Sequence, residues 1–89
     1  MISKTTHIVN KLGLHARPSA MLVSTAAKFE CEVFFTKDDL RVNGKSIMGV
    51  MMLAAEAGAE LTVEVDGPDE VAALEAILSV IATGFGEGD

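Results

Sequence analysis

The residues best suited to chemistry are a histidine and an arginine two positions apart, His15 and Arg17, at the predicted start of a helix. Pro18 falls in the first helical turn, where its missing N–H removes no intrahelical hydrogen bond. The free backbone amides of Ala16 and Arg17 then point outward, and such a helix start binds phosphate readily. The positive helix end also disfavours imidazolium, so we expect a largely neutral ring with a nitrogen able to accept a phosphoryl group.

This combination of nucleophile, amide cradle and cation lacks the other parts of an enzyme site. The sequence shows no general base adjacent to His15, no set of metal ligands and no substrate pocket. The pattern therefore favours a carrier that takes a phosphoryl group from one protein and gives it to another, without metal or cofactor. A short His-x-Arg motif also occurs by chance, in which case His15 is a loop residue and Arg17 a surface charge.

A second motif begins at Ser46, which is expected to cap a short helix that extends to Leu53. The apolar side chains of this helix cannot all point inward, although methionine stripes are more often core than interface. Methionine adapts to several partner surfaces, so we predict a docking patch for proteins that includes the outer face of the helix after His15. The residues of this docking patch are Ala20, Met21, Ser24, Lys28, Ile47, Met48 and Met51.

Hydrophobic patterning predicts the elements that position these residues. Four β-branched or alternating segments indicate strands, at residues 5–9, 32–36, 40–42 and 61–66. Three segments with helical spacing indicate helices, at residues 16–28, 46–53 and from a cap at Asp69 to near Gly84. The order βαββαβα in one small domain favours an α+β fold, a four-stranded antiparallel sheet with three helices on one face.

The same patterns predict which side chains are buried. Val33 and Phe35 should face the core, which leaves Phe34 on the outer face of the sheet. Cys31 is expected to be a small buried hydrophobe, and residues 85–89 are expected to fray. The last helix should bury one apolar face, formed by Val71, Leu74, Ile77, Leu78 and Ile81.

Composition excludes several other classes of protein. The 89 residues suit one domain, and the formal net charge of −6 argues against a general nucleic-acid binder. The charge is uneven, because residues 1–50 hold all seven Lys and Arg, whereas residues 51–89 hold nine acids and no base. The single cysteine excludes an intramolecular disulfide. No apolar run is long enough to insert into a membrane, and residues 1–6 lack the apolar region of a signal peptide, so we expect a cytoplasmic monomer.

Both motifs together resemble one family of proteins. Residues 13–18 (GLHARP) and 45–51 (KSIMGVM) are similar to the HPr phosphocarriers of the bacterial phosphoenolpyruvate-dependent sugar phosphotransferase system, at the family's spacing and over nearly the whole chain. The resemblance implies an open-faced β-sandwich and phosphorylation of His15 on Nδ1. It also implies phosphorylated Enzyme I as donor and A domains of sugar permeases as acceptors. Leu12, where many members have a polar residue, and Ala54, near a common glycine position, depart from the pattern.

The resemblance gives Ser46 a second possible role beside capping. In many bacteria the matching serine is phosphorylated by an HPr kinase/phosphorylase. Phosphate would add about −1.5 to −2 charges at a helix start, which suits the helix dipole but places negative charge inside the docking patch.

Two other readings remain open from the sequence. One is a purely regulatory binding module, in which Ser46 is read by a partner and His15 transfers little. The other is a free-standing enzyme such as a phosphohistidine phosphatase. The intact His15-Ala16-Arg17 motif favours the carrier over the regulatory module. The lack of a second catalytic group argues against the free-standing enzyme.

Overall fold

Four strands form one antiparallel sheet in the computed structural model, which describes residues 1–87. The strand order is β1-β4-β2-β3, so the last strand in sequence lies between the first and second. The predicted α+β class and the βαββαβα order are confirmed. The elements are β1 (Ile2–His7), α1 (Ala16–Ala27), β2 (Glu32–Lys37), β3 (Leu40–Asn43), α2 (Ile47–Met52), β4 (Glu60–Asp66), α3 (Glu70–Ala82) and a 3₁₀ turn, η1 (Gly84–Gly86).

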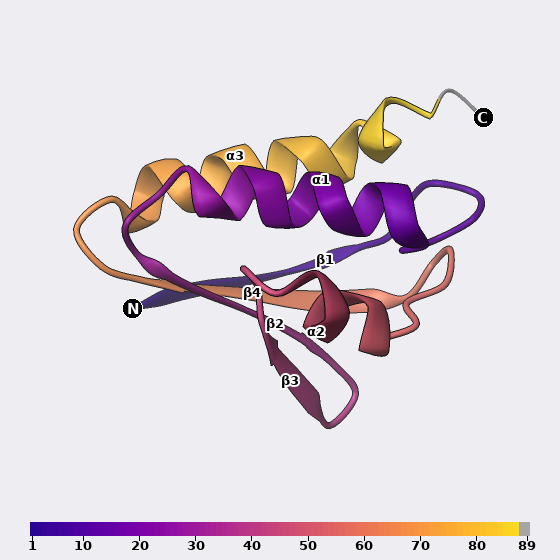
Figure 1. The fold of residues 1–89 in the computed structure, drawn as a ribbon, viewed down its shortest axis with the longest axis horizontal. Coiled ribbons are helices and arrows are strands. Elements are labelled where there is room, and N and C mark those ends of the chain that lie inside the picture. The colour runs from indigo at the N-terminus through magenta and orange to yellow at the C-terminus, as the bar shows by residue number, and fades with distance from the viewer. Residues whose placement is uncertain (88–89) are drawn as a thin grey trace.

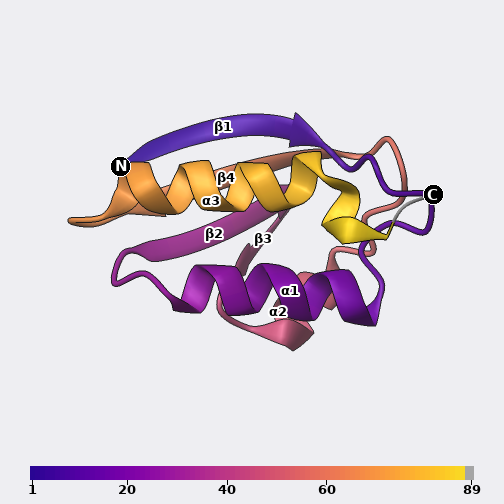
Figure 2. The same cartoon turned by 90° about the horizontal axis from the view of Figure 1, so that it is seen from above.

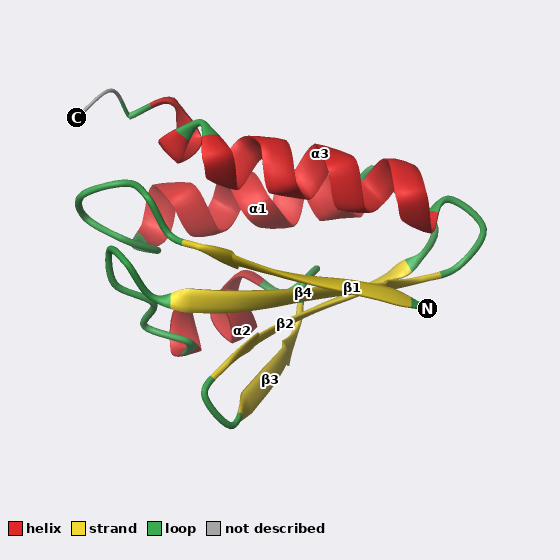
Figure 3. Ribbon diagram, turned by 180° about the vertical axis from the view of Figure 1, so that it is seen from behind, coloured by secondary structure: helices red, strands yellow, loops and turns green. Residues whose placement is uncertain are grey.

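The helices cover one face of this sheet. Helices α1 and α3 lie side by side over it, and the short α2 packs against α1 and β3 (Figures 1 and 2). Seen from behind, both long helices lie on the same side of β1 and β4, and within residues 1–87 the opposite face of the sheet carries no long helix (Figure 3). On that face the hydroxyls of Thr5 and Thr62 lie 3.1 Å apart across β1 and β4. The arrangement is the open-faced β-sandwich that the resemblance implies.

The core lies between the sheet and the two long helices. The predicted inward residues of β2, Val33 and Phe35, pair with Val65 and Val63 of β4, and all four are buried. Because side chains alternate along a strand, Phe34 points to the opposite face of the sheet, as predicted. It is half-buried there because the Arg41 guanidinium lies over its ring, 3.8 Å from the centroid.

The first strand begins and ends earlier than its β-branched residues indicate. It pairs with β4 from Ile2, opposite Val65, to His7, opposite Glu60, rather than spanning residues 5–9. After His7 the chain leaves the sheet, and the buried Ile8 bonds instead to the loop before β4. Long-range pairing therefore decides these ends, and β-propensity alone does not.

The buried face and the N-cap of α3 both differ from those that the sequence predicts. Val71, expected in the core, is 60% exposed, because the helix packs through Ala73, Ile77 and Ile81, which follow one another at intervals of four. Asp69 precedes the helix but makes no side-chain cap. Its carboxylate accepts hydrogen bonds from the amides of Glu30 (2.8 Å) and Cys31 (2.9 Å) instead. The bond from Glu30 is the main reason that the pKa of Asp69 lies below its usual value.

The C-terminal segment is the largest correction to the sequence-based expectation. Residues 85–87 do not fray: Phe85 is only 1% exposed and belongs to the core. The chain turns back at Gly84 and Gly86, both in the left-handed region, and Phe85 itself has φ 58°. Burial of a whole aromatic side chain offsets the cost of that backbone conformation. Residues 88–89, also expected to fray, lie outside the described residues.

We predict that Phe85→Ala will lower the free energy of unfolding by about 3 kcal/mol or more, because it removes a buried aromatic side chain. Val71→Ala is the matched control, since this exposed residue should change stability by less than about 0.5 kcal/mol. Urea unfolding of both variants measures the difference. Equal losses would contradict the placement of Phe85 in the core.

Candidate functional site

His15 lies at the exact start of α1, as its N-cap residue, with an extended backbone (φ −78°, ψ −169°). Its carbonyl accepts the first hydrogen bond of the helix, from the Ser19 amide at 3.0 Å. Its side chain does not cap the helix and is 39% exposed. The imidazole is therefore partly exposed to solvent, and His15 lies at the helix start where the sequence predicts it.

The amides of Ala16 and Arg17 are available at this helix start. They precede the first residue able to form an intrahelical bond, and Pro18 has no N–H. Within residues 1–87 neither amide has a hydrogen-bond acceptor. Such amides, together with the positive end of the helix dipole, favour an anion next to His15.

The loop before His15 is fixed by a close backbone contact. Leu14 is buried, and its amide donates to the Ala55 carbonyl at 2.8 Å. Gly13 has φ 71°, and a Cβ there would lie 2.4 Å from the same carbonyl oxygen. Glycine is thus required at this position both for its backbone conformation and for the space it leaves. The loop holds the His15 backbone at one place relative to the segment after α2.

A carboxylate from the far end of the chain contacts the imidazole. Glu87 Oε2 lies 2.7 Å from His15 Nε2, and Oε1 accepts a hydrogen bond from Asn10 Nδ2 at 2.9 Å. The Asn10 bond is the main reason that the pKa of Glu87 is lowered; partial burial opposes this, and the contact with His15 adds to it. The sequence shows no carboxylate next to His15, but the fold places the Glu87 carboxylate there. No spacing signal points to Glu87, which is 72 positions away.

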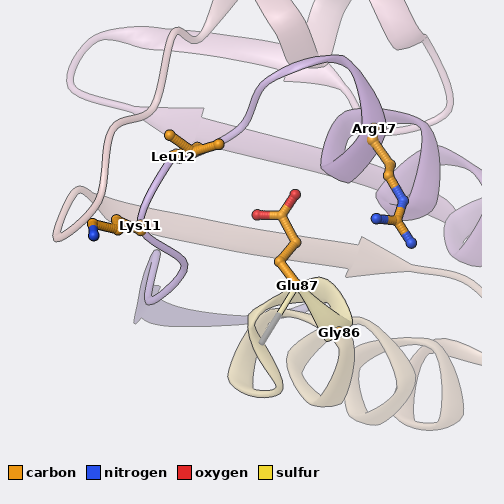
Figure 4. Close-up of a pocket in the computed structure, with 5 residues that line it drawn as sticks. All are labelled: Lys11, Leu12, Arg17, Gly86 and Glu87. Atoms are coloured by element: carbon orange, nitrogen blue, oxygen red, sulfur yellow. The ribbon is translucent and has the colours of Figure 1, made fainter. Parts of the chain in front are cut away.

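Arg17 and Glu87 line one pocket at the helix start, together with Lys11, Leu12 and Gly86 (Figure 4). The Glu87 carboxylate projects into the pocket between Leu12 and Arg17. The Arg17 side chain is exposed, so its guanidinium can approach an anion bound by the helix amides. Among residues 1–87, no three His, Cys, Asp or Glu side chains cluster in a way that could hold a metal ion.

Ser46 caps α2 as predicted, and its Oγ accepts a hydrogen bond from the Gly49 amide at 3.0 Å. Helix α2 then presents its apolar side chains to solvent. Met48 is 77% exposed and Met51 43%. These values agree with an outward-facing methionine cluster rather than a core stripe.

The structure brings the two halves of the docking patch onto adjoining helices. Helices α1 and α2 are in contact, and Figure 2 shows α2 beneath α1. On α1, Ala20, Ser24 and Lys28 are exposed and Met21 is half-buried. A shallow hollow runs along this face from Arg17 to Lys28. The patch is thus continuous with the surface that carries His15.

Comparisons with known proteins agree with this fold and identify a family. The family model described as "PTS HPr component phosphorylation site" matches residues 2–83. The phosphocarrier protein HPr of Neisseria meningitidis serogroup A is 52% identical over 89 residues, covering 100% of both chains. The protein of the same name from Treponema pallidum is 48% identical over 87 residues, covering 98% of this chain and 99% of its own. The crystal structure of HPr-C-His from Thermoanaerobacter tengcongensis superposes with a TM-score of 0.96, at 43% identity and full coverage of both chains.

The open-faced β-sandwich, matched by the family model over residues 2–83, is the architecture of small histidine phosphocarriers of the sugar phosphotransferase system. The chain belongs to the HPr family. No helix among residues 1–87 is long and apolar enough to cross a bilayer.

We predict that Gly13→Ala will destabilise the protein by about 1–3 kcal/mol more than Gly58→Ala, because only the first forces a side chain into occupied space. Both glycines have positive φ, so both variants share a left-handed cost of about 1–2 kcal/mol. A Cβ at Gly58 meets nothing within 4 Å. Thermal and urea unfolding test the difference. Equal losses of stability would show that the backbone of Ala55 does not restrict the side chain at position 13.

Proposed function

We propose that the chain accepts a phosphoryl group on His15 from phosphorylated Enzyme I and passes it to A domains of sugar permeases or to regulatory partners. The observation that carries this proposal is the half-exposed His15 imidazole at the start of α1, beside Arg17 and two amides that make no hydrogen bond within residues 1–87. Membership of the HPr family supports the same assignment. The proposed location is the cytoplasm, and the proposed working state is a monomer.

In the acceptor step, the lone pair of a neutral His15 ring nitrogen attacks the phosphorus of the donor. The bond between phosphorus and the donor's leaving atom breaks, and its electron pair remains with the donor. Negative charge on the phosphoryl oxygens is stabilised by the amides of Ala16 and Arg17 and by the Arg17 guanidinium. Transfer to an acceptor protein reverses these roles, so the site needs no cofactor of its own.

This geometry supports a carrier better than a regulatory module or an enzyme. A regulatory module that its partner recognises only through phosphorylated Ser46 would not require an imidazole at the start of α1. A phosphatase would have to activate water and close the site around its substrate. His15 instead stands on an open surface beside the docking patch, where a partner protein can reach it.

Mixing the protein with Enzyme I, labelled phosphoenolpyruvate and magnesium tests the proposal. We expect an acid-labile label on the wild-type protein and none on His15→Ala, because the replacement removes the only proposed acceptor. His7→Ala is the matched control, since His7 is an exposed strand residue on β1. A His15→Ala protein that still takes the label would disprove the proposed acceptor.

The exposure of Met48 allows a direct test of the docking patch. Met48→Glu should weaken binding of Enzyme I with little loss of stability, since this side chain is 77% exposed. Val71→Glu adds the same charge at an exposed site on α3 and should leave binding unchanged. Titration calorimetry with Enzyme I compares the two variants. A lower melting temperature with unchanged affinity of the folded Met48→Glu protein would remove Met48 from the patch.

We further propose Ser46 as a regulatory phosphorylation site for an HPr kinase/phosphorylase, acting through charge. Ser46 lies at the start of α2, so a phosphate there enters the docking patch beside Ile47 and Met48. The charged residues that line the hollow along α1, Arg17 and Lys28, are cations, which suits an acidic docking face on Enzyme I. A phosphate would therefore repel the partner more than it disturbs the helix.

We predict that Ser46→Asp will slow labelling of His15 by Enzyme I and that salt will recover part of the loss, because exposed charges are screened. Stability should stay equal or rise slightly, since a carboxylate suits a helix start. Labelling rates of wild type and Ser46→Asp across a salt series provide the measurement, with Ser46→Ala as the uncharged control. Equal wild-type and Ser46→Asp rates at low salt would remove the electrostatic mechanism. Separately, failure of a purified HPr kinase to label Ser46 would remove the regulatory role.

A further inference from the structure

The segment after α3 delivers Glu87 to the imidazole through a well-anchored turn. Phe85 is buried in the core, and left-handed glycines on either side of it reverse the chain. The turn is also held by backbone bonds from Gly86 to Thr83 (3.3 Å) and from Glu87 to Gly84 (3.1 Å). The Glu87 side chain is only 14% exposed. Its carboxylate is therefore held at one place beside His15.

A buried amide fixes the direction of this carboxylate. Asn10 is fully buried, and its Nδ2 donates both to the Gly13 carbonyl (2.8 Å) and to Glu87 Oε1 (2.9 Å). Two acceptors at the same atom set the orientation of the amide, since the reverse would place oxygen against oxygen. Asn10 Oδ1 is left without a partner within residues 1–87. Asn10 links Glu87 to the loop before His15, and this link explains why a polar side chain with one unpaired oxygen lies in the core.

Only one position of the ring proton allows neutral His15 to form a hydrogen bond with Glu87. An ionised carboxylate can only accept hydrogen bonds, and the lowered pKa of Glu87 keeps it ionised near neutral pH. At 2.7 Å, Nε2 must therefore be the donor when the ring is neutral. The other ring nitrogen, Nδ1, makes no hydrogen bond within residues 1–87 and keeps its lone pair.

We infer that Glu87 is a positioning residue for phosphoryl transfer: it holds the proton of neutral His15 on Nε2 and so presents Nδ1 as the acceptor atom. The inference rests on the proposed function. When the Nδ1 lone pair forms its bond to phosphorus, the bond to the donor breaks and the donor keeps that electron pair. The ring then gains positive charge while the proton stays on Nε2, and the adjacent carboxylate stabilises that charge.

A spectroscopic test reads the proton directly and needs no partner protein. The spectrum is recorded at pH about 9, well above the ordinary pKa of a histidine side chain, which is about 6.5. The ¹⁵N spectrum of the wild type should show the proton of His15 on Nε2 and an Nε2–H resonance that exchanges slowly with water. His7 is an internal reference, because its contact with Glu60 is 3.9 Å long and both side chains are exposed. Its N–H should exchange rapidly.

Two replacements at Glu87 and one elsewhere complete the test. Glu87→Ala should abolish the slowly exchanging N–H of His15 and shift its ring nitrogens towards the values of His7. Glu87→Gln has the same shape and can still accept a hydrogen bond through its amide oxygen, so it should retain part of the signal without the charge. Glu60→Gln is the matched control and should leave His15 unchanged, since it alters the other histidine–glutamate contact.

The rate of phosphoryl transfer then tests whether the position of the His15 ring proton affects the proposed function. Labelling of His15 by Enzyme I should be about 3- to 10-fold slower in Glu87→Ala, the ratio expected for losing one hydrogen bond, and Glu87→Gln should lie between it and the wild type. A melting curve of each variant accompanies the rates. If Glu87→Ala is unfolded, Glu87→Gln decides the question by the same two measurements.

The outcomes separate this inference from the proposed function. Absence of label on the wild type, or label on His15→Ala, overturns the proposed function and this inference with it. A wild type labelled on His15, with folded Glu87 variants that keep its rate or its Nε2–H signal, overturns the inference alone. Loss of the signal together with a slower rate supports both.

Discussion

An α-helix cannot satisfy the amides of its own first turn, and the site depends on this constraint. Pro18 removes one of these donors, and Ser19 is the first residue to bond back, to the His15 carbonyl at 3.0 Å. The amides of Ala16 and Arg17 remain open to solvent beside the imidazole. Packing keeps the helix start in place, because Pro18 and Ser19 are buried and the Ser19 hydroxyl donates to the Leu14 carbonyl. The proposed phosphate position thus follows from the ordinary geometry of a helix end.

Features that depend on nearby residues were predictable from the sequence. The start of α1, the Ser46 cap and the alternation in β2 each follow from residues a few positions apart, and each agrees with the structure. The exposure of Met48 followed from crowding within one short helix. The fold class followed from the order of such local segments.

The errors share a different cause, which is contact between segments far apart in sequence. Asp69 looks like a helix cap, but its carboxylate bonds to amides 38 and 39 positions away. Val71 fits the apolar spacing of α3, yet the orientation set by the sheet buries Ala73 instead. Glu87 sits in a short, glycine-rich acidic tail, a composition typical of disorder. The buried side chain of Phe85 explains why residues 85–87 have a defined structure.

The departures from the family pattern also acquire a physical meaning in the fold. Ala54 follows α2 with φ 49°, a left-handed conformation that favours glycine, so this position costs stability without touching the phosphate site. Leu12 is 73% exposed and lines the pocket with Arg17 and Glu87. An apolar side chain there adds no competing hydrogen bond near the Glu87 carboxylate. The carboxylate can therefore remain directed at Nε2, with its other oxygen held by Asn10.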